Sequence, residues 1–273
     1  VFVFLVAVPR AISVQRNRET LTDIRQMGKL FYEPNLWRLN FGIFTLHLVL
    51  MAGFVVIPTI LTAEMGISGD NLWWVYLLLI GGGFFAMLPV MILGEKYRRQ
   101  KYSFVAAVAS MAIIMSLLGL YRGSLVTGFM LWLFFAAFNL LEAMLPSWLS
   151  KACPAGQKGT AMGIYSTSQF LGAFAGGILG GWSLQQFGID GLFLLLAVIL
   201  AIWCLVALGL QTPRALQTVV LNVGDMAHEK FAKLILKVPG VEDILIVKGE
   251  QLAYAKVDKK TVDMSSLKPY FNR

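Results

Sequence analysis

The sequence predicts an all-α bundle of membrane-spanning helices followed by a small α+β domain. Hydrophobic residues make up 58% of the 273 residues and charged residues only 14%, whereas a soluble domain of this size is far more polar. Crossing the hydrocarbon core of a bilayer takes roughly 20 mainly apolar residues in a helix. Six stretches have this length: residues 39–61, 73–93, 102–120, 129–148, 162–182 and 192–210. Beyond residue 212 these stretches stop, and the composition becomes that of a soluble domain.

The connections between the six spans alternate in charge, which predicts how the bundle is oriented. The turns after the second and fourth spans are basic, as is the segment before the first span. Their cations include Lys96, Arg98, Arg99, Lys101, Lys151 and Lys158, whereas the opposite turns carry Glu64, Asp70, Asp190 and Arg122. By the positive-inside rule, the basic turns and the C-terminal domain are cytoplasmic. This orientation accounts for the net charge of +8, so we expect no nucleic-acid partner.

The N-terminal residues predict that more of the chain lies upstream. Residues 1–9 are apolar but too few to cross a bilayer, and they lack the basic start and cleavage site of a signal peptide. We expect them to be the end of a truncated transmembrane helix. Residues 10–36 then form a cytoplasmic linker with a short amphipathic helix that begins near Thr20 and ends at Glu33 and Pro34. Residues 37–212 form the membrane bundle.

Residues 213–273 have the alternating pattern of a small α+β domain. Residues 218–223 favour a strand, 226–238 a helix, and 241–247 with 252–257 a hairpin. A last short helix begins at Asp263 or Ser265 and runs to Phe271. The order β-α-β-β-α is typical of a ferredoxin-like domain that lacks its final strand. At roughly 60 residues, this domain is large enough to fold alone.

Two ionisable side chains lie within the predicted spans, and such groups indicate function by default. Glu142 is in the fourth span, where a charge costs about 3 kcal/mol, and His47 is in the first. A buried carboxylate and an imidazole are the side chains best suited to picking up and releasing a proton. Asn139 and Asn40 lie on the same helix faces as Glu142 and His47. The alternative is a structural hydrogen bond between Glu142 and His47 or an amide.

Other polar and small residues of the spans have structural explanations beside the functional ones. Tyr165 and Gln169 form a polar stripe at the start of the fifth span, which either lines a cavity or makes packing hydrogen bonds. Gly172, Gly176 and Gly180 are spaced four apart and predict close packing of two helices. Arg122 lies in an outer turn and is expected to extend to the lipid headgroups.

Motifs of the common enzymes do not occur in the sequence. There is no GxxxxGK[ST] nucleotide loop, no HExxH and no GxSxG. Cys153 and Cys204 are isolated, and neither belongs to a CxxC pair or a His cluster. We therefore expect no metal site, no cofactor and no enzymatic activity.

Three stretches resemble the C-terminal half of a transporter of the major facilitator superfamily. Residues 30–37 (LFYEPNLW) are similar to the loop that leads into the seventh helix of that fold. Residues 94–101 (GEKYRRQK) resemble the basic loop motif after helix eight, although the acidic residue and second glycine of that motif are missing. The resemblance implies that the conformational role of this motif falls to Gly94, Lys96, Arg98 and Arg99. Residues 138–147 (FNLLEAMLPS) and 154–172 (PAGQKGTAMGIYSTSQFLG) form the third stretch.

The resemblance implies that the six spans are helices seven to twelve, that residues 1–9 end helix six, and that the N-terminal half is missing. It further implies a proton-coupled efflux carrier for small, drug-like molecules, which works by alternating access in a bacterial inner membrane. The ferredoxin-like tail distinguishes this carrier from most of the superfamily. Helices seven and ten of the fold line the central cavity, so His47 and Glu142 would face the same space. The implied substrate and proton pathway comprises Glu142, His47, Asn40, Asn139, Tyr165 and Gln169.

Two other classes of protein compete with this interpretation. A membrane-anchored sensor or regulatory protein would work through its cytoplasmic domain and would lose its output on deletion of residues 214–273. A carrier would keep at least some flux without those residues. An intramembrane enzyme is disfavoured because the sequence shows no nucleophile–base pair and no set of metal ligands.

Overall fold

A computed structural model describes residues 28, 30, 32–154, 157–212, 216–224, 226–246, 251–258 and 261–271. The chain divides into two compact units, a helical bundle and a small α+β unit that is built mainly from the residues after Ala215. The all-α bundle and the α+β tail predicted from the sequence are both confirmed. The predictions for residues 1–27, which include the truncated helix and the start of the amphipathic helix, lie outside the described residues.

The first four spans follow the predicted apolar stretches but extend beyond them. The first consists of α3 (Pro34–Phe54), α4 (Ile57–Thr59) and the π-helical turn η2 (Ile60–Glu64). The second consists of η3 (Gly69–Asn71), α5 (Leu72–Tyr76), the π-helical turn η4 (Leu77–Gly81) and α6 (Gly82–Lys96). The third and fourth are α7 (Gln100–Leu120) and α8 (Ser124–Ala152). Glu33 caps α3 by accepting a 2.6 Å hydrogen bond from the Leu36 N–H, which is why this span begins several residues before its apolar stretch.

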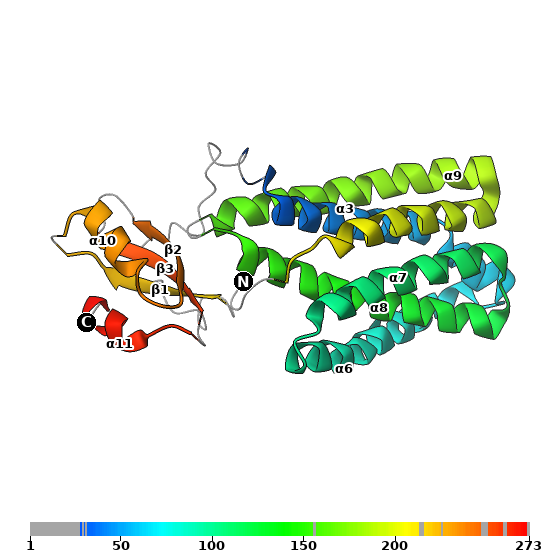
Figure 1. Cartoon of the computed structure of the whole chain (residues 1–273). Helices are drawn as coiled ribbons and strands as arrows, with labels where there is room; N and C mark the ends of the chain where they lie inside the picture. Colours follow the sequence, from blue (N-terminus) through cyan, green and yellow to red (C-terminus); the bar gives the residue numbers. More distant parts are fainter. Residues whose placement is uncertain are drawn as a thin grey trace, which may run out of the picture. The chain divides into compact units, whose positions relative to one another are not determined.

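The fifth and sixth spans form one continuous element, α9 (Lys158–Leu208), which is 51 residues long. A straight helix of that length would measure about 77 Å, more than twice the thickness of the hydrocarbon core. The helical backbone is interrupted at Gly188, whose φ of 67° lies in the left-handed region that favours glycine. Figure 1 shows α9 reversing its direction at one end of the bundle, so that its second half runs antiparallel to its first. Within the part of the chain that the structure describes, five long apolar helices therefore provide the six predicted spans.

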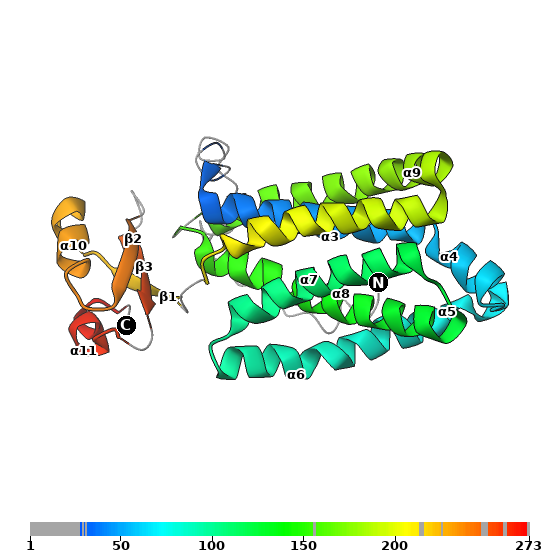
Figure 2. The ribbon, with the colours of Figure 1, turned by 45° about the vertical axis from the view of Figure 1, so that its right-hand side comes forward.

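Close contacts with α3 show the same reversal. Gly172 and Gly176 lie against the backbone of Phe44 and Leu48, so the first half of α9 runs parallel to α3. In the second half the order is reversed, because Gly209 lies against Arg38 and Trp203 lies against Gly42. The helix α3 thus packs between two antiparallel halves of α9 (Figure 2).

The interior of the bundle is filled by large aromatic side chains from α7, α8 and α9. Phe104 stacks on Trp148 with ring centroids 5.2 Å apart, and it meets Trp203 edge-on at 6.0 Å. All three side chains are almost completely buried. Gly83 of α6 lies on the backbone of α8, where a Cβ atom would come within 2.8 Å of the Ala136 nitrogen. These contacts hold α8 in the middle of the bundle.

At each end of the bundle, polar side chains join the ends of neighbouring helices. At one end Arg122 forms ion pairs with Glu64 and Asp190 and donates to the Leu118 carbonyl at 2.9 Å. The expectation that Arg122 extends to lipid headgroups is therefore wrong, because its guanidinium joins the ends of three spans. At the other end the Gln211 N–H donates to the side chain of Asn35 at 3.2 Å, which brings the beginning of α3 to the end of α9.

The α+β unit contains a three-stranded antiparallel sheet in the order β1-β3-β2. Its elements are β1 (Leu216–Asn222), α10 (His228–Ile235), β2 (Val241–Ile246), β3 (Leu252–Asp258), α11 (Met264–Leu267) and the 3₁₀ turn η5 (Lys268–Tyr270). Phe231 and Ile235 of α10 are buried against Ala253 and Ala255 of the central strand β3. The predicted succession of strands and helices is confirmed, and Asp263 rather than Ser265 caps the last helix.

Candidate functional site

Three helices bring one polar side chain each to a single place within the bundle. His47 comes from α3, Glu142 from α8 and Gln169 from the first half of α9. The close approach of α9 to α3 depends on Gly172, which lies one turn after Gln169 and has no room for a side chain. The sequence thus places a long amide where two helices are closest, and the fold adds the carboxylate from α8.

The amide of Gln169 links the other two groups. Its Nε2 atom lies 2.9 Å from Nε2 of His47 and 3.4 Å from Oε1 of Glu142. A carboxamide nitrogen has two hydrogens, so it can donate to both groups at once. In that arrangement Nε2 of His47 accepts, and the proton of a neutral imidazole resides on Nδ1. This Nδ1 atom is 3.9 Å from Oε2 of Glu142.

Burial differs between the two titratable groups. The side chain of His47 is 12% exposed and that of Glu142 is 37% exposed, so the carboxylate is the more accessible member of the pair. Its Oε2 atom is nevertheless buried and has no hydrogen-bond partner within the described part of the chain. Phe138 packs its ring against His47 with centroids 5.9 Å apart. An unpaired buried oxygen is costly, and it marks a position where another donor can bind.

Tyr165 lies on the same helix as Gln169, but among the described residues it makes no hydrogen bond to the trio. Its ring is 4% exposed, and its hydroxyl is buried without a hydrogen-bond partner among the residues that the structure describes. Tyr165 precedes Gln169 by four residues, about one turn of α9, so the two side chains lie on the same side of the helix. The structure therefore brings together Glu142, His47 and Gln169, with Tyr165 beside them.

The two predicted asparagines lie outside this trio. Asn139 donates from Nδ2 to the Ile80 carbonyl at 3.1 Å, and Ile80 belongs to the π-helical turn η4. A π-helical turn changes the register of the backbone hydrogen bonds, and the side chain of Asn139 supplies a donor to the Ile80 carbonyl within this turn. Asn40 is 6% exposed and lies seven residues before His47, which places it about 10 Å away along α3. Nothing in the sequence near Ile80 indicates the π-helical turn.

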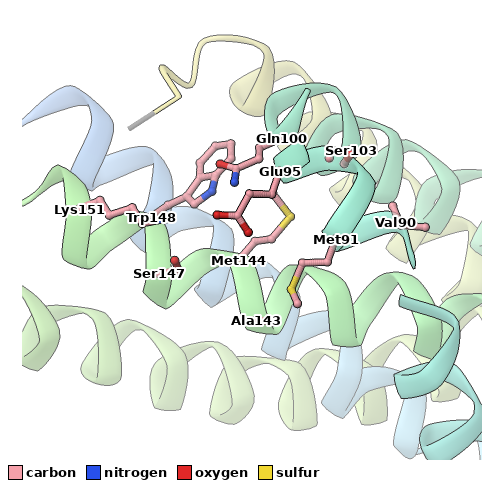
Figure 3. A pocket seen from close by; sticks show the side chains of 11 residues that line it. Val90, Met91, Glu95, Gln100, Ser103, Ala143, Met144, Ser147, Trp148 and Lys151 are labelled. Carbon is pink, nitrogen blue, oxygen red and sulfur yellow. The ribbon is translucent and has the colours of Figure 1, made fainter. Parts of the chain in front are cut away.

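The basic loop motif forms the turn from α6 to α7. Arg98 has a φ of 55°, and the Arg99 N–H donates to the Gly94 carbonyl at 2.8 Å. A Cβ atom on Gly94 would lie 2.8 Å from Oγ of Ser103, so glycine permits the two helices to approach here. A cavity of about 80 Å³ lies beside this turn, and Glu95 of α6 and Lys151 of α8 are among the residues that line it (Figure 3). Metal-ligating clusters are absent from the described residues, in this cavity and elsewhere.

A bundle of six spans with a carboxylate–amide–imidazole trio in its interior has the architecture of a membrane carrier. The sequence profile of the Major Facilitator Superfamily matches residues 1–246. The chain therefore belongs to the major facilitator superfamily, and it is a multi-pass membrane protein of a transporter family.

Relatives with curated descriptions are transporters as well. The chain is 38% identical over 263 residues to the inner membrane transport protein YajR of Escherichia coli (strain K12), which covers 94% of this chain and 57% of YajR. It is 33% identical over 169 residues to an uncharacterised transporter of Buchnera aphidicola, covering 60% of this chain and 42% of that protein. The chain thus spans about half the length of the relatives it matches.

Proposed function

We propose that the chain acts as the C-terminal half of a proton-coupled secondary transporter that exports small, drug-like molecules. Membership of the major facilitator superfamily and the similarity to YajR support this proposal. The relative is longer than the chain, and its additional length is enough for a second bundle of helices. The two bundles would rock about a central site, so that the site opens to each side of the membrane in turn.

The observation that carries the proposal is the contact of Gln169 with both His47 and Glu142. In the arrangement described, the amide stabilises a deprotonated Glu142 and a neutral His47 by donating to each. A proton arriving at Glu142 would weaken its contact with Gln169, because protonation removes the negative charge to which the amide N–H donates. The carboxylate is partly exposed, so protons and a cationic substrate can compete for it. Such competition is the minimum that an exchanger requires.

We also place the α+β unit in the cytoplasm and the bundle in a bacterial inner membrane. The basic turns and the end of α9 lie at the same end of the bundle as Asn35, and the positive-inside rule assigns that end to the cytoplasm. The sheet order β1-β3-β2 and the bridge between Leu221 and Phe271 at the free edge of β1 support a ferredoxin-like fold for this unit.

The test is transport by the full-length protein in liposomes with an imposed pH gradient. Glu142→Gln keeps the shape of the side chain but cannot take up a proton, so proton-driven flux should fall at least tenfold and lose its dependence on pH. Asp70→Asn is the matched control, because Asp70 is an exposed carboxylate of a turn. If Glu142→Gln transports like the unmodified protein at every pH, Glu142 is not the coupling group.

Deleting residues 214–273 distinguishes a carrier from a sensor. The α+β unit has a hydrophobic core of its own, formed around Phe231 and Leu267, so its removal leaves the core of the bundle intact. A carrier lacking this unit should retain measurable flux. Complete loss of flux, with the bundle still folded, would favour a protein that works through its C-terminal domain.

A further inference from the structure

The helix α10 carries a basic face that takes no part in the core of the α+β unit. Lys230, Lys233 and Lys237 are spaced three and four residues apart, so they share one side of the helix and the turn that follows it. All three are exposed. Phe231 and Ile235 are fully buried and lie on a different side, which faces the sheet.

Apolar side chains lie among these lysines. Leu234 is 41% exposed between Lys233 and Lys237, and Met226, in the bend that precedes α10, is 38% exposed. A helix face that only contacts water gains nothing from large apolar groups in its middle. Lysines interleaved with exposed leucine and methionine are the pattern of a helix that lies at the surface of a membrane. We refer to Met226, Lys230, Lys233, Leu234 and Lys237 as the basic face.

The chain keeps this unit close to the membrane. Asn35 and Gln211 hydrogen bond to each other, which fixes the end of α9 to the start of α3. Only four peptide steps separate Thr212 from Leu216, the first residue of β1, so the connection reaches at most about 14 Å. Such a short tether gives the unit a high effective concentration at the bilayer surface.

The loops at the same end of the bundle are net basic even with Glu95 included, so charge disfavours them as the partner of this face. The turns at the same end of the bundle contain Lys96, Arg98, Arg99, Lys101 and Lys151. These cations would repel three further lysines. The complementary surface at that end is the layer of anionic lipid headgroups. Each lysine near this layer raises the equilibrium constant for binding to it about fivefold.

We propose that the basic face of α10 docks on anionic headgroups of the cytoplasmic leaflet. Three lysines together favour the docked state about a hundredfold over a neutral surface, and Leu234 and Met226 insert at the level of the headgroups. The proposal rests on the cytoplasmic placement of the α+β unit but not on transport or proton coupling.

Lysine footprinting of the full-length protein in lipid nanodiscs tests this docking. An amine-reactive acylating reagent is applied to protein in phosphatidylcholine discs and in discs with one-third phosphatidylglycerol, and the modification rate of each lysine is measured by mass spectrometry. Lys230, Lys233 and Lys237 should react at least threefold more slowly in the anionic discs, and this difference should vanish in high salt. Lys268, an exposed lysine of η5, is the control within the same sample and should react equally in both discs.

Variants separate lipid docking from a protein contact. Leu234→Ser should weaken the protection of all three lysines in anionic discs, although it removes no charge. Equal rates in both discs would overturn the proposal, and so would equally strong protection in phosphatidylcholine alone, which would indicate a protein partner. A failure of Glu142→Gln to affect transport would overturn the proposed coupling but would leave this result unchanged.

Discussion

Gly172 of α9 lies so close to Phe44 of α3 that a side chain on the glycine would overlap the Phe44 carbonyl oxygen. Gly176 and Gly180 make the same kind of contact with Leu48 and Ala52 further along α3. Neither helix gains hydrophobic energy by leaving lipid for the other, so this close backbone contact is what holds them together. The contact also sets the distance between His47 and Gln169.

Gly172→Ala and Gly176→Ala should each destabilise the protein by about 2 kcal/mol or more, because the new methyl group meets backbone that cannot move aside. Thermal unfolding in detergent measures the loss. Gly177→Ala and Gly181→Ala are matched controls on the same helix, since open space surrounds both positions, and they should unfold like the unmodified protein. Equal stability of the Gly172 and Gly177 variants would show that the helices are not in backbone contact.

Gln169→Leu should reduce proton-driven flux about tenfold while leaving the bundle folded. Leucine fills a similar volume but leaves Nε2 of His47 and Oε1 of Glu142 without the amide, a loss worth about 1–3 kcal/mol. Flux across a pH gradient in liposomes is the measurement. Ser168→Ala is the control, because among the described residues the Ser168 hydroxyl bonds only to the Ile164 carbonyl of its own helix. Unchanged coupling in Gln169→Leu would mean that the amide serves packing alone.

Arg122→Gln should lower the free energy of unfolding by about 1–2 kcal/mol. The arginine pairs with Glu64 and Asp190, but Asp190 is 65% exposed, so solvent screens part of the attraction. The difference in thermal unfolding temperature between this variant and the unmodified protein should shrink in 1 M salt. Lys101→Gln, a change of equal charge at the other end of the bundle, should cost less. A salt-independent loss would point to the hydrogen bond with Leu118 instead.

Asp263 should make the stability of α11 depend on pH. Hydrogen bonds from Ser265 and Ser266 hold the pKa of this exposed carboxyl below its ordinary value. A lowered pKa means that the cap is fully effective above the ordinary carboxyl range and is lost as the pH falls through the folded-state value. Hydrogen exchange of the α11 amides, corrected for the intrinsic rate, should therefore speed up at acidic pH. Asp263→Asn should abolish this dependence, whereas Glu229→Gln on α10 should leave it unchanged.

The sequence predicted the spans well, because bilayer thickness imposes a length that hydropathy shows directly. It also selected Glu142, His47 and Gln169, since polar groups within apolar helices are conspicuous. It did not predict that Asn139 would bond to Ile80, because a π-helical turn has no sequence signature. The pairing of Arg122 with Glu64 and Asp190 was missed for another reason. Glu64 and Asp190 lie 58 and 68 positions from Arg122 along the chain, and only the packing of three spans brings them to it.

The reversal at Gly188 has a consequence for how the protein enters the bilayer. Residues 183–191 contain a single charged residue, Asp190, so only one charge has to be carried across the hydrocarbon core between the last two spans. The two halves of α9 can therefore enter together as a helical hairpin during synthesis, and neither has to wait for a loop to be translocated. The same compactness leaves little room at this end for a protease site or an inserted tag.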